Sequence, residues 1–336
     1  MTFTAAIHVA LAFDDRMALP AMSVIKSLER IHAQEDAIVV HIMHDAHMTF
    51  DVSSITKAFE NPTVHIALYQ AKNDYSHLIS EPRFSKATFY RFELFECLRD
   101  LRRCIYLDAD TLVRRNLRSL YATDMGEYCL AACADLGLKY LLEDNDWKIP
   151  YLSCSYNKAS YLKEVLGMTT TRYLNAGVMV ADLDLWNRNK VGARAIEFCL
   201  SHPGLWLLDQ DAINHALNGR FLRLDPRWNS FAYIKRHYAD REAKPRSSAW
   251  NYIVETWSND AWIAHFSAES KPWMPEHAET PYDLEFWDNI METPFSRALQ
   301  DEYIKRVMRH SRRERGSLKK IPHRYNPPWK RLIYGF

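Results

Sequence analysis

Residues 103–113 read Arg-Cys-Ile-Tyr-Leu-Asp-Ala-Asp-Thr-Leu-Val. The run from Cys104 to Leu107 is short, apolar and partly β-branched or aromatic, which predicts a strand buried on both faces. Because a buried strand does not tolerate unpaired charges, we expect Asp108 and Asp110 to emerge at its carboxyl end. Open α/β sheets bind their ligands at that edge, and two carboxylates suit a Mg²⁺ or Mn²⁺ ion that holds a phosphate.

The Asp-x-Asp pattern alone is a weak signal, because the chain contains it four times. The other copies are Asp144/Asp146, Asp182/Asp184 and Asp209/Asp211. Only the copy at Asp108 directly follows an apolar strand and precedes a second apolar pair, Leu112-Val113. A solvated acidic turn at a strand end is the alternative interpretation, and the context favours a metal site.

The composition is that of an ordinary globular protein. The chain has 336 residues, 48% hydrophobic and 25% charged, enough for one large α/β domain or two smaller ones. Its six cysteines are scattered and form no Cys-x-x-Cys pair, which predicts a reduced, cytosolic protein. We expect no signal peptide, since residues 1–13 run directly into a charged segment, and no membrane span, since no apolar stretch approaches about 18 residues.

Glycine content and charge distribution narrow the function further. The chain has nine glycines and the first is Gly126, so no glycine-rich phosphate loop can lie in the opening units. This tells against a nicotinamide dehydrogenase or a P-loop enzyme.

From Lys305 onward eleven Lys and Arg accompany one acid, a net charge of +10, whereas the whole chain carries +1. An acidic body with a basic tail indicates two different partners.

Apolar runs alternate with helix-start signals along the chain. Strands are predicted at 3–13, 37–43, 63–68 and 128–133, with helices from Pro20, over 53–59 and over 86–98. This alternation favours parallel βαβ units in an α/β fold. Farther on we expect a lid or helix over the site at 144–160, a strand at 173–181, and helices at 183–187, 191–200 and 212–217, the last started by Asp209-Gln210-Asp211. We predict one catalytic domain, residues 1–285, followed by a helical and basic extension, residues 286–336.

A second set of candidate ligands lies near the end of the apolar run 262–264. His265 follows this run, and Lys271-Pro272-Trp273 comes shortly after it. A histidine at a strand end is often a satisfied core or surface residue, which is the alternative here. Imidazole beside two carboxylates, however, makes a good Mn²⁺ ligand set, and the long cationic side chain of Lys271 suits a diphosphate.

Six motifs together resemble the family 8 glycosyltransferases, especially the bacterial lipopolysaccharide and lipooligosaccharide α-galactosyl- and α-glucosyltransferases. The motifs occur in the family's order between residues 3 and 273. They are Ala12-Phe13-Asp14-Asp15, Phe89-Tyr90-Arg91, Tyr106-Leu107-Asp108-Ala109-Asp110, Leu174-Asn175-Ala176-Gly177, Asp209-Gln210-Asp211, and His265-x-x-Ala268-x-x-Lys271-Pro272-Trp273. Each motif alone is modest evidence, and their shared order makes the resemblance specific.

The resemblance implies a GT-A fold, in which a single Rossmann-like mixed sheet is flanked by helices, together with a UDP-hexose donor, a Mn²⁺ or Mg²⁺ ion and retention of anomeric configuration. It implies that the metal ligands are Asp108, Asp110 and His265. Residues implied to contact the donor are Ala12, Phe13, Asp14, Asp15, Arg91, Asp108, Ala109, Asn175, Asp211, Ala268 and Lys271. Asp209 and Gln210 would be the catalytic residues, with Gln210 nearest the reacting carbon.

Two positions depart from the family pattern. Arg16 stands where the family usually has Asn, two residues after the first acid, which puts one uridine contact in question. Ala268 stands where the last motif usually has Gly. Because a methyl group there would crowd the approach of the backbone to phosphate, we expect a slight local shift rather than lost binding.

The chemistry is coherent on the residues alone. A UDP leaving group gains negative charge as its bond breaks, and a divalent ion with Lys271 would neutralise that charge. The sugar becomes oxocarbenium-like, which favours nearby carboxylate and amide oxygens such as those of Asp209 and Gln210. Because an amide is a poor nucleophile, we favour attack by the acceptor hydroxyl on the same face over a covalent intermediate, and the sequence leaves both open.

Two other functions compete with this interpretation. Asp108-Ala109-Asp110-Thr111 also satisfies the signature of haloacid-dehalogenase-type phosphatases, but that family has its motif near the start of the domain, and here three strands precede it. A non-catalytic carbohydrate-binding protein on a transferase fold is the second alternative, since ten Trp and eighteen Tyr could stack on sugars.

The basic tail suggests where the protein works. Residues 305–336 interleave positive charge with aromatic and aliphatic residues, which favours an anionic membrane surface over nucleic acid. A solvated, partly disordered end is the alternative. We therefore expect a cytoplasmic enzyme, peripheral on the cytoplasmic face of the inner membrane, whose acceptor is a lipid-linked oligosaccharide.

Overall fold

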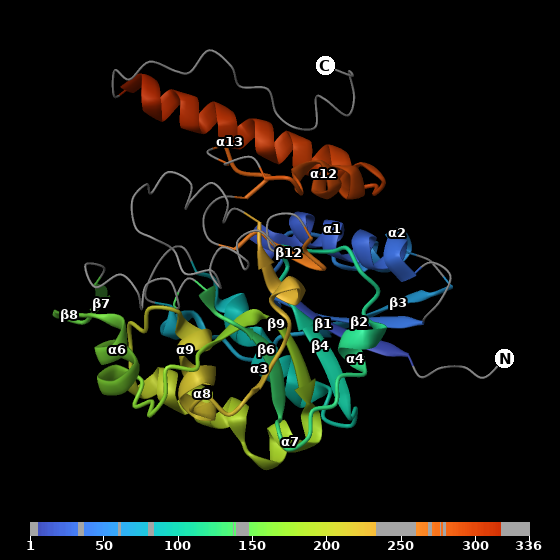
Figure 1. Ribbon diagram of the computed structural model, residues 1–336. Helices are drawn as coiled ribbons and strands as arrows, with labels where there is room; N and C mark the ends of the chain where they lie inside the picture. Colours follow the sequence, from blue (N-terminus) through green and yellow to red (C-terminus); the bar gives the residue numbers. More distant parts are fainter. Residues whose placement is uncertain are drawn as a thin grey trace.

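The computed structural model describes residues 6–32, 37–59, 62–79, 84–136, 138, 148–232, 260–267, 271–275, 277 and 280–316, with side chains to residue 310. Its centre is a seven-stranded sheet in the order β10-β6-β9-β4-β1-β2-β3. These strands are β1 (Ile7–Phe13), β2 (Ile38–His44), β3 (Val64–Gln70), β4 (Arg103–Leu107), β6 (Leu130–Ala134), β9 (Leu174–Asp182) and β10 (Leu222–Arg223). Figure 1 shows this sheet between two layers of helices.

The sheet is mixed, because one central strand runs against its neighbours. β1 pairs in parallel with both β2 and β4, as the alternating pattern predicts. β9 lies antiparallel between β4 and β6, and all nine of its residues are buried. An all-parallel sheet would therefore be wrong, and the mixed GT-A sheet implied by the family resemblance is confirmed. The apolar run of β9 gives no indication of strand direction, since burial on both faces suits either.

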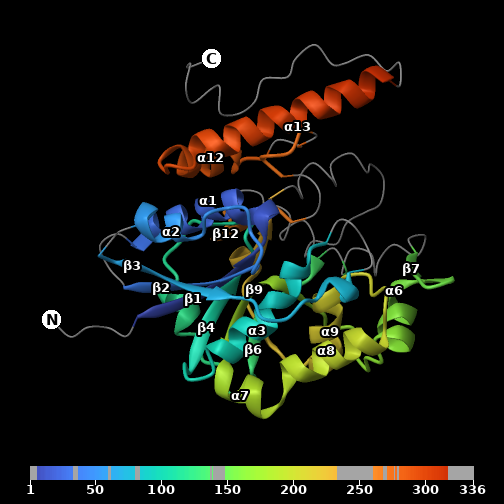
Figure 2. The same cartoon turned by 180° about the vertical axis from the view of Figure 1, so that it is seen from behind.

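Side chains of β1 alternate between two hydrophobic cores. Val9 and Leu11 belong to the core under α1 (Asp15–His32), whereas Ala10 and Ala12 belong to the core under α3 (Tyr90–Cys97). The second core also receives α7 (Leu183–Arg188), α8 (Val191–Ser201) and α9 (Leu208–Leu217). Figure 2 shows these two helix layers on opposite sides of the sheet. Of the two short helices, α2 (Ser53–Ala58) contacts the edge strand β3 and α4 (Arg118–Tyr121) contacts the central strand β4.

Two helices begin earlier than the sequence predicts. α1 starts at Asp15 rather than at Pro20, because the backbone N–H groups of Met17 and Ala18 already bond to the Asp14 carbonyl. Pro20 therefore lies inside the helix, where its missing N–H removes one helical hydrogen bond. α9 starts at Leu208, one residue before the Asp209-Gln210-Asp211 triplet that the sequence predicts as its start, so Asp209 and Gln210 lie in its first turn. The predicted helix 86–98 is confirmed as a 3₁₀ turn, η2 (Lys86–Phe89), that continues into α3.

Two small sheets flank the main one. β5 (Thr111–Val113), β11 (Ser230–Phe231) and β12 (Ile263–His265) form a three-stranded sheet in which β12 runs antiparallel to β5 and parallel to β11. β7 (Ile149–Tyr151) and β8 (Cys154–Tyr156) form a hairpin. The predicted lid at 144–160 is thus a hairpin followed by α6 (Lys158–Ser160) over its described part, and its residues 144–147 lie outside the described residues.

The C-terminal helices pack on α1. α12 (Asp283–Met291) and α13 (Ser296–Gly316) lie above that helix in Figure 1, and Trp287, Ile290 and Leu299 join its hydrophobic core. The domain boundary predicted at residue 285 falls inside α12 and stays a prediction. Among the described residues, no helix is both long enough and apolar enough to span a bilayer.

Candidate active site

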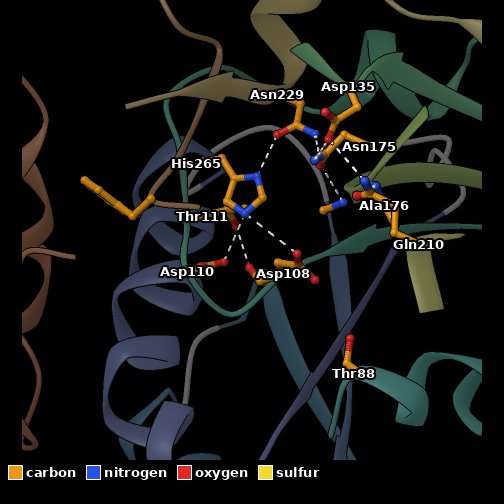
Figure 3. A network of polar contacts seen from close by, with 12 residues as sticks. Thr88, Asp108, Asp110, Thr111, Asp135, Asn175, Ala176, Gln210, Asn229 and His265 are labelled. Carbon is orange, nitrogen blue, oxygen red and sulfur yellow. Dashed lines mark hydrogen bonds and ion pairs between the residues drawn. The ribbon is translucent and has the colours of Figure 1, made fainter. Parts of the chain in front are cut away.

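Three ligand-type side chains meet where β4 ends and β5 begins. Asp108 directly follows β4, Asp110 directly precedes β5, and His265 on β12 pairs with Thr111 across the small sheet. His265 Nε2 lies 3.2 Å from Asp110 Oδ1 and 3.7 Å from Asp108 Oδ2. The three ligand atoms all lie within 4.8 Å of one another, and Figure 3 shows them converging on one point. We call these three residues the metal-site cluster.

Gly177 on β9 leaves the space that this cluster occupies. A Cβ at position 177 would lie 2.3 Å from His265 Cε1 and 2.9 Å from Asp108 Oδ2, closer than atoms can approach without displacement. Only glycine therefore allows the imidazole and the carboxylate to pack here. One nitrogen and two carboxylate ligands held this way fit a divalent ion such as Mn²⁺ or Mg²⁺.

Cationic side chains of the protein neutralise the two aspartates. Lys271 Nζ bonds to Asp110 Oδ2 and to the carbonyl of Phe266, and Arg91 Nη2 lies 3.0 Å from Asp108 Oδ1. Burial alone would raise the pKa of Asp110, but Lys271 and His265 outweigh it and hold that pKa well below its ordinary value. Asp110 is therefore held as a carboxylate, the form that binds a metal.

Arg91 joins the metal-site cluster to Asp209. Its buried guanidinium donates to the carbonyls of Ala176 and Thr88, and its Nε lies 3.0 Å from Asp209 Oδ2. Because that Nε–H points to Thr88, Asp209 Oδ2 receives no hydrogen bond from the described residues, whereas Oδ1 accepts one from Thr88 Oγ1. Burial raises the pKa of Asp209, and Arg91 opposes that rise.

A network of amide side chains borders the same space. Asn175 Nδ2 and Gln210 Nε2 both donate to Asp135 Oδ2, at 2.8 and 3.1 Å, and Gln210 Oε1 accepts from the backbone of Ala176 at 2.9 Å. Asn229 connects this network to His265. Figure 3 shows these residues on the side of the imidazole away from the aspartates. We call Asp135, Asn175, Gln210 and Asn229 the amide cluster.

The predicted nucleotide residues lie at the carboxyl end of β1. Ala12 and Phe13 are the last two residues of that strand and are buried. Asp14 accepts hydrogen bonds from Ser85 Oγ and from the backbone of Arg16. The carboxylate of Asp15 accepts from the backbone of Thr49 and Phe50, at about 2.9–3.0 Å, so it holds the chain after β2. Contacts between these residues and the UDP-sugar stay predictions.

Asp211 is buried and hydrogen-bonded within the protein. It is fully buried on α9, and its carboxyl accepts from the hydroxyls of Tyr161 and Tyr173 and from the backbone of Leu207. Burial raises its pKa to about 6, although these hydrogen bonds act in the opposite direction. Both carboxyl oxygens of Asp211 already accept hydrogen bonds from the protein. A contact between Asp211 and the UDP-sugar stays a prediction. Ala109 is buried between the two aspartates, and Ala268 lies outside the described residues.

Sequence reasoning missed three residues of this site. Asp135 and Asn229 belong to the amide cluster, and Thr88 bonds to Asp209. Asp135 carried a signal, because it follows the strand predicted at 128–133 just as Asp108 follows its own strand. Asn229 and Thr88 carried none, since their contacts depend on how η4 (Pro226–Asn229) and η2 pack.

The fold and this site together define a glycosyltransferase of the GT-A class. A family comparison agrees, because residues 8–276 match the family described as Glycosyl transferase family 8. The chain therefore belongs to glycosyltransferase family 8. The haloacid-dehalogenase alternative is not supported by this assignment.

Curated relatives cover about two thirds of the chain. General stress protein A of Bacillus subtilis is 29% identical over 67% of this chain and 71% of its own length. Lipopolysaccharide 1,2-glucosyltransferase of Escherichia coli is 25% identical over 69% of this chain, and lipopolysaccharide 1,3-galactosyltransferase of Salmonella typhimurium is 22% identical over 71%. The aligned part spans 64% and 65% of those two transferases, slightly under two thirds of each.

Solved structures confirm the fold. A galactosyltransferase, LgtC, determined with donor and acceptor sugar analogs, superposes with a TM-score of 0.67 at 20% identity, over 86% of this chain and 96% of its own. The bifunctional glycosyltransferase WbbM superposes with a TM-score of 0.74 at 18% identity, over 90% of this chain and 52% of its own.

Proposed function

We propose that this protein transfers a hexose, galactose or glucose, from a UDP-sugar to a saccharide acceptor, with retention of configuration and dependence on Mn²⁺ or Mg²⁺. The observation that carries the proposal is the metal-site cluster, whose three ligand atoms lie within 4.8 Å of one another at the end of a central strand. The names of two relatives, a glucosyltransferase and a galactosyltransferase of lipopolysaccharide, support the sugar and the acceptor class.

The metal-site cluster and Lys271 would hold the diphosphate. Asp108, Asp110 and His265 would be the ligands of the divalent ion, which when bound would neutralise charge that develops on the leaving group. Lys271 now bonds to Asp110 and to a backbone carbonyl. Once a divalent ion binds Asp110, the ammonium group of Lys271 would be available to a phosphate oxygen. The positive charge around the diphosphate would thus come from the ion and one side chain.

Asp209 and Gln210 would face the sugar from the first turn of α9. Asp209 Oδ2 is a buried acceptor that no described residue supplies with a hydrogen bond, so it can accept one from a sugar hydroxyl. The amide of Gln210 is held at both ends, by Ala176 and by Asp135. Because a fixed amide is a poor nucleophile, we favour attack by the acceptor hydroxyl on the face from which UDP departs, with Gln210 Oε1 stabilising the oxocarbenium-like sugar.

The acceptor would be a lipid-linked oligosaccharide such as the lipopolysaccharide core, reached from the cytoplasmic face of the inner membrane. On α13, Ile304 and Met308 are exposed one helical turn apart, 42% and 55% respectively. Lys305 and Arg309 follow each of them and are exposed as well. Apolar and basic residues that alternate along a surface helix favour binding to an anionic bilayer.

Hydrolysis of UDP-sugars tests the proposal directly. UDP-galactose and UDP-glucose should each be offered with Mn²⁺, with Mg²⁺ and with EDTA, and UDP release measured. We expect one sugar to be hydrolysed slowly and only with the metal. A protein that bound saccharide but released no UDP from any UDP-sugar would be a non-catalytic binding protein, and release that persisted in EDTA would contradict the metal site.

A further inference from the structure

Asn229 contacts a predicted metal ligand from outside the set of ligands. Its Oδ1 lies 2.8 Å from His265 Nδ1, on the side of the imidazole that faces away from the two aspartates. Both residues are buried, with 2% and 3% of their surface exposed. A hydrogen bond between two groups this buried determines where the imidazole can carry its protons.

The direction of the hydrogen bonds made by Asn175 and Asn229 follows from one backbone group. The N–H of Gly177 can only donate, and it points to Asn175 Oδ1 at 2.9 Å. The oxygen end of Asn175 is therefore fixed, and its Nδ2 donates to Asp135. Asn229 Nδ2 donates to the same Oδ1 at 2.8 Å, so the group that Asn229 turns toward His265 is its oxygen.

An oxygen at this place requires a proton on His265 Nδ1. In the neutral imidazole, the form that binds a metal, the Nε2 atom then holds the lone pair, and it is the atom that lies 3.2 Å from Asp110. We propose that Asn229 is a positioning residue that fixes the tautomer and orientation of His265 for metal binding. This inference rests on the proposed metal site and adds a residue to it.

Backbone pairing keeps Asn229 and His265 together. Asn229 ends the 3₁₀ turn η4, whose N-cap Asp225 accepts from the backbone of Arg227, and β11 begins at the next residue. β11 pairs with β12 so that Phe231 lies opposite His265, and the ring of Phe231 packs edge-on against the imidazole, 5.8 Å between centroids. The ring of Phe231 and the side chain of Asn229 thus hold the imidazole in the space that Gly177 leaves open.

The same hydrogen bonds connect His265 to Gln210, which faces the sugar in the proposed function. Asn229 bonds to Asn175, and Asn175 and Gln210 share Asp135 Oδ2 as their acceptor. A shift of the imidazole would therefore move polar groups that are all buried and all paired. Such networks resist partial disruption, because each unpaired member would keep its full desolvation cost.

The test measures Mn²⁺ binding to the full chain rather than turnover. Free Mn²⁺ is titrated by electron paramagnetic resonance, with and without UDP, on the wild type, Asn229→Leu, Asn229→Asp and Asn289→Leu. Asn289 is the matched control, because it is a buried asparagine on α12 that accepts a hydrogen bond from Arg30 on α1, away from the metal-site cluster. Unfolding temperatures confirm that each variant is folded.

We expect Asn229→Leu to weaken Mn²⁺ binding by roughly 10–100-fold, as loss of a ligand's orienting partner does. Asn289→Leu should stay within about twofold of the wild type. Asn229→Asp keeps an oxygen for His265 Nδ1 but loses the donor to Asn175, so it should retain most of the Mn²⁺ affinity while UDP-sugar hydrolysis falls. If Asn229→Leu does not fold, Asn229→Ala provides the same comparison.

The outcomes separate this inference from the proposed function. A wild type that binds no Mn²⁺, even with UDP, would refute the metal site itself. A wild type that binds Mn²⁺ through Asp110, together with an Asn229→Leu variant that binds equally well, would overturn only the role of Asn229. An Asn229→Asp variant as weak as Asn229→Leu would overturn the orienting oxygen.

Discussion

The metal-site cluster and the amide cluster share His265 as a border but are built on different principles. In the metal-site cluster, the side chains of Asp108 and Asp110 are 27% and 12% exposed, and their charge is offset by Arg91 and Lys271. In the amide cluster every member is less than a tenth exposed and is held by hydrogen bonds between neutral amides and one carboxylate.

This difference indicates which region binds a ligand and which region keeps side chains in position. The two carboxylates of the metal-site cluster are partly exposed and lie beside an imidazole nitrogen, so this region can accept a divalent cation. The members of the amide cluster are already hydrogen-bonded, so this region fixes the position of Gln210 before a sugar binds. We therefore expect substitutions in the first region to affect metal and nucleotide, and substitutions in the second to affect sugar chemistry and stability.

The largest effect should come from Asp110→Ala. It removes a metal ligand at the edge of the sheet, so the fold should persist while hydrolysis falls about a thousandfold or more, since a catalytic metal supplies several kcal/mol. UDP affinity should fall and lose its dependence on Mn²⁺ in calorimetry. Asp184→Ala is the matched control, because Asp184 belongs to another Asp-x-Asp copy and is exposed. Normal Mn²⁺-dependent UDP binding by Asp110→Ala would remove the distinction between the two regions.

The next largest effect should come from Asp209→Asn and Gln210→Ala. Both residues face the sugar in our proposal, so turnover should fall by about a hundredfold while UDP affinity changes little. Hydrolysis kinetics and UDP calorimetry on the same preparations would measure both quantities. Equal losses in turnover and in UDP affinity would instead place these residues at the nucleotide.

The two regions also differ in how far the sequence could predict them. Asp108 follows the apolar run of β4, so strand patterning places it and Asp110 at the end of that strand. His265 ends an apolar run in the smaller sheet, and the family resemblance, not the pattern, joined it to the two aspartates. Asn229 meets His265 through a 3₁₀ turn and a two-residue strand, and neither element has a hydrophobic period that could reveal it. The direction of β9 was hidden for a related reason, since its apolar run suits parallel and antiparallel pairing alike.

A smaller effect concerns stability and involves Asp211, which lies directly after Gln210. Its pKa is raised to about 6 in the folded protein against an ordinary 3.8, so the folded state binds its proton more tightly than the unfolded state. The protonated form therefore stabilises the fold below about pH 4, and this contribution is lost as the pH rises to about 6. The loss is on the order of 3 kcal/mol.

Urea denaturation between pH 4 and 7 would measure this contribution. Asp211→Asn should lower stability at every pH, because its NH₂ group must face one of three donors, but it should also remove the pH-dependent part. The gap between wild type and variant should hence narrow as the pH rises. Asp184→Asn serves as the exposed control. A constant gap for Asp211→Asn would mean that Asp211 does not take up a proton in the folded protein over this pH range.

The smallest effect on both regions should come from deletion of residues 311–336. These residues hold eight Lys and Arg and one acid, a net charge of +7, while the buried contacts of α13 come from Leu299 and Tyr303 before the cut. We expect UDP-sugar hydrolysis to stay within about twofold of the full chain. Binding to the membrane should fall strongly, because each basic residue near an anionic surface contributes roughly 1 kcal/mol.

Co-sedimentation with vesicles at about 0.15 M salt would measure this, because salt at that concentration already screens weak surface attraction. The full chain should pellet with vesicles that contain anionic lipid and stay in solution with neutral ones, and the deletion variant should stay in solution with both. If the deletion variant still pelleted with anionic vesicles, the exposed Ile304 and Met308 of α13 would be the next residues to replace, with serine. If hydrolysis fell together with vesicle binding, the tail would belong to the catalytic region, and the separation between site and anchor would be wrong.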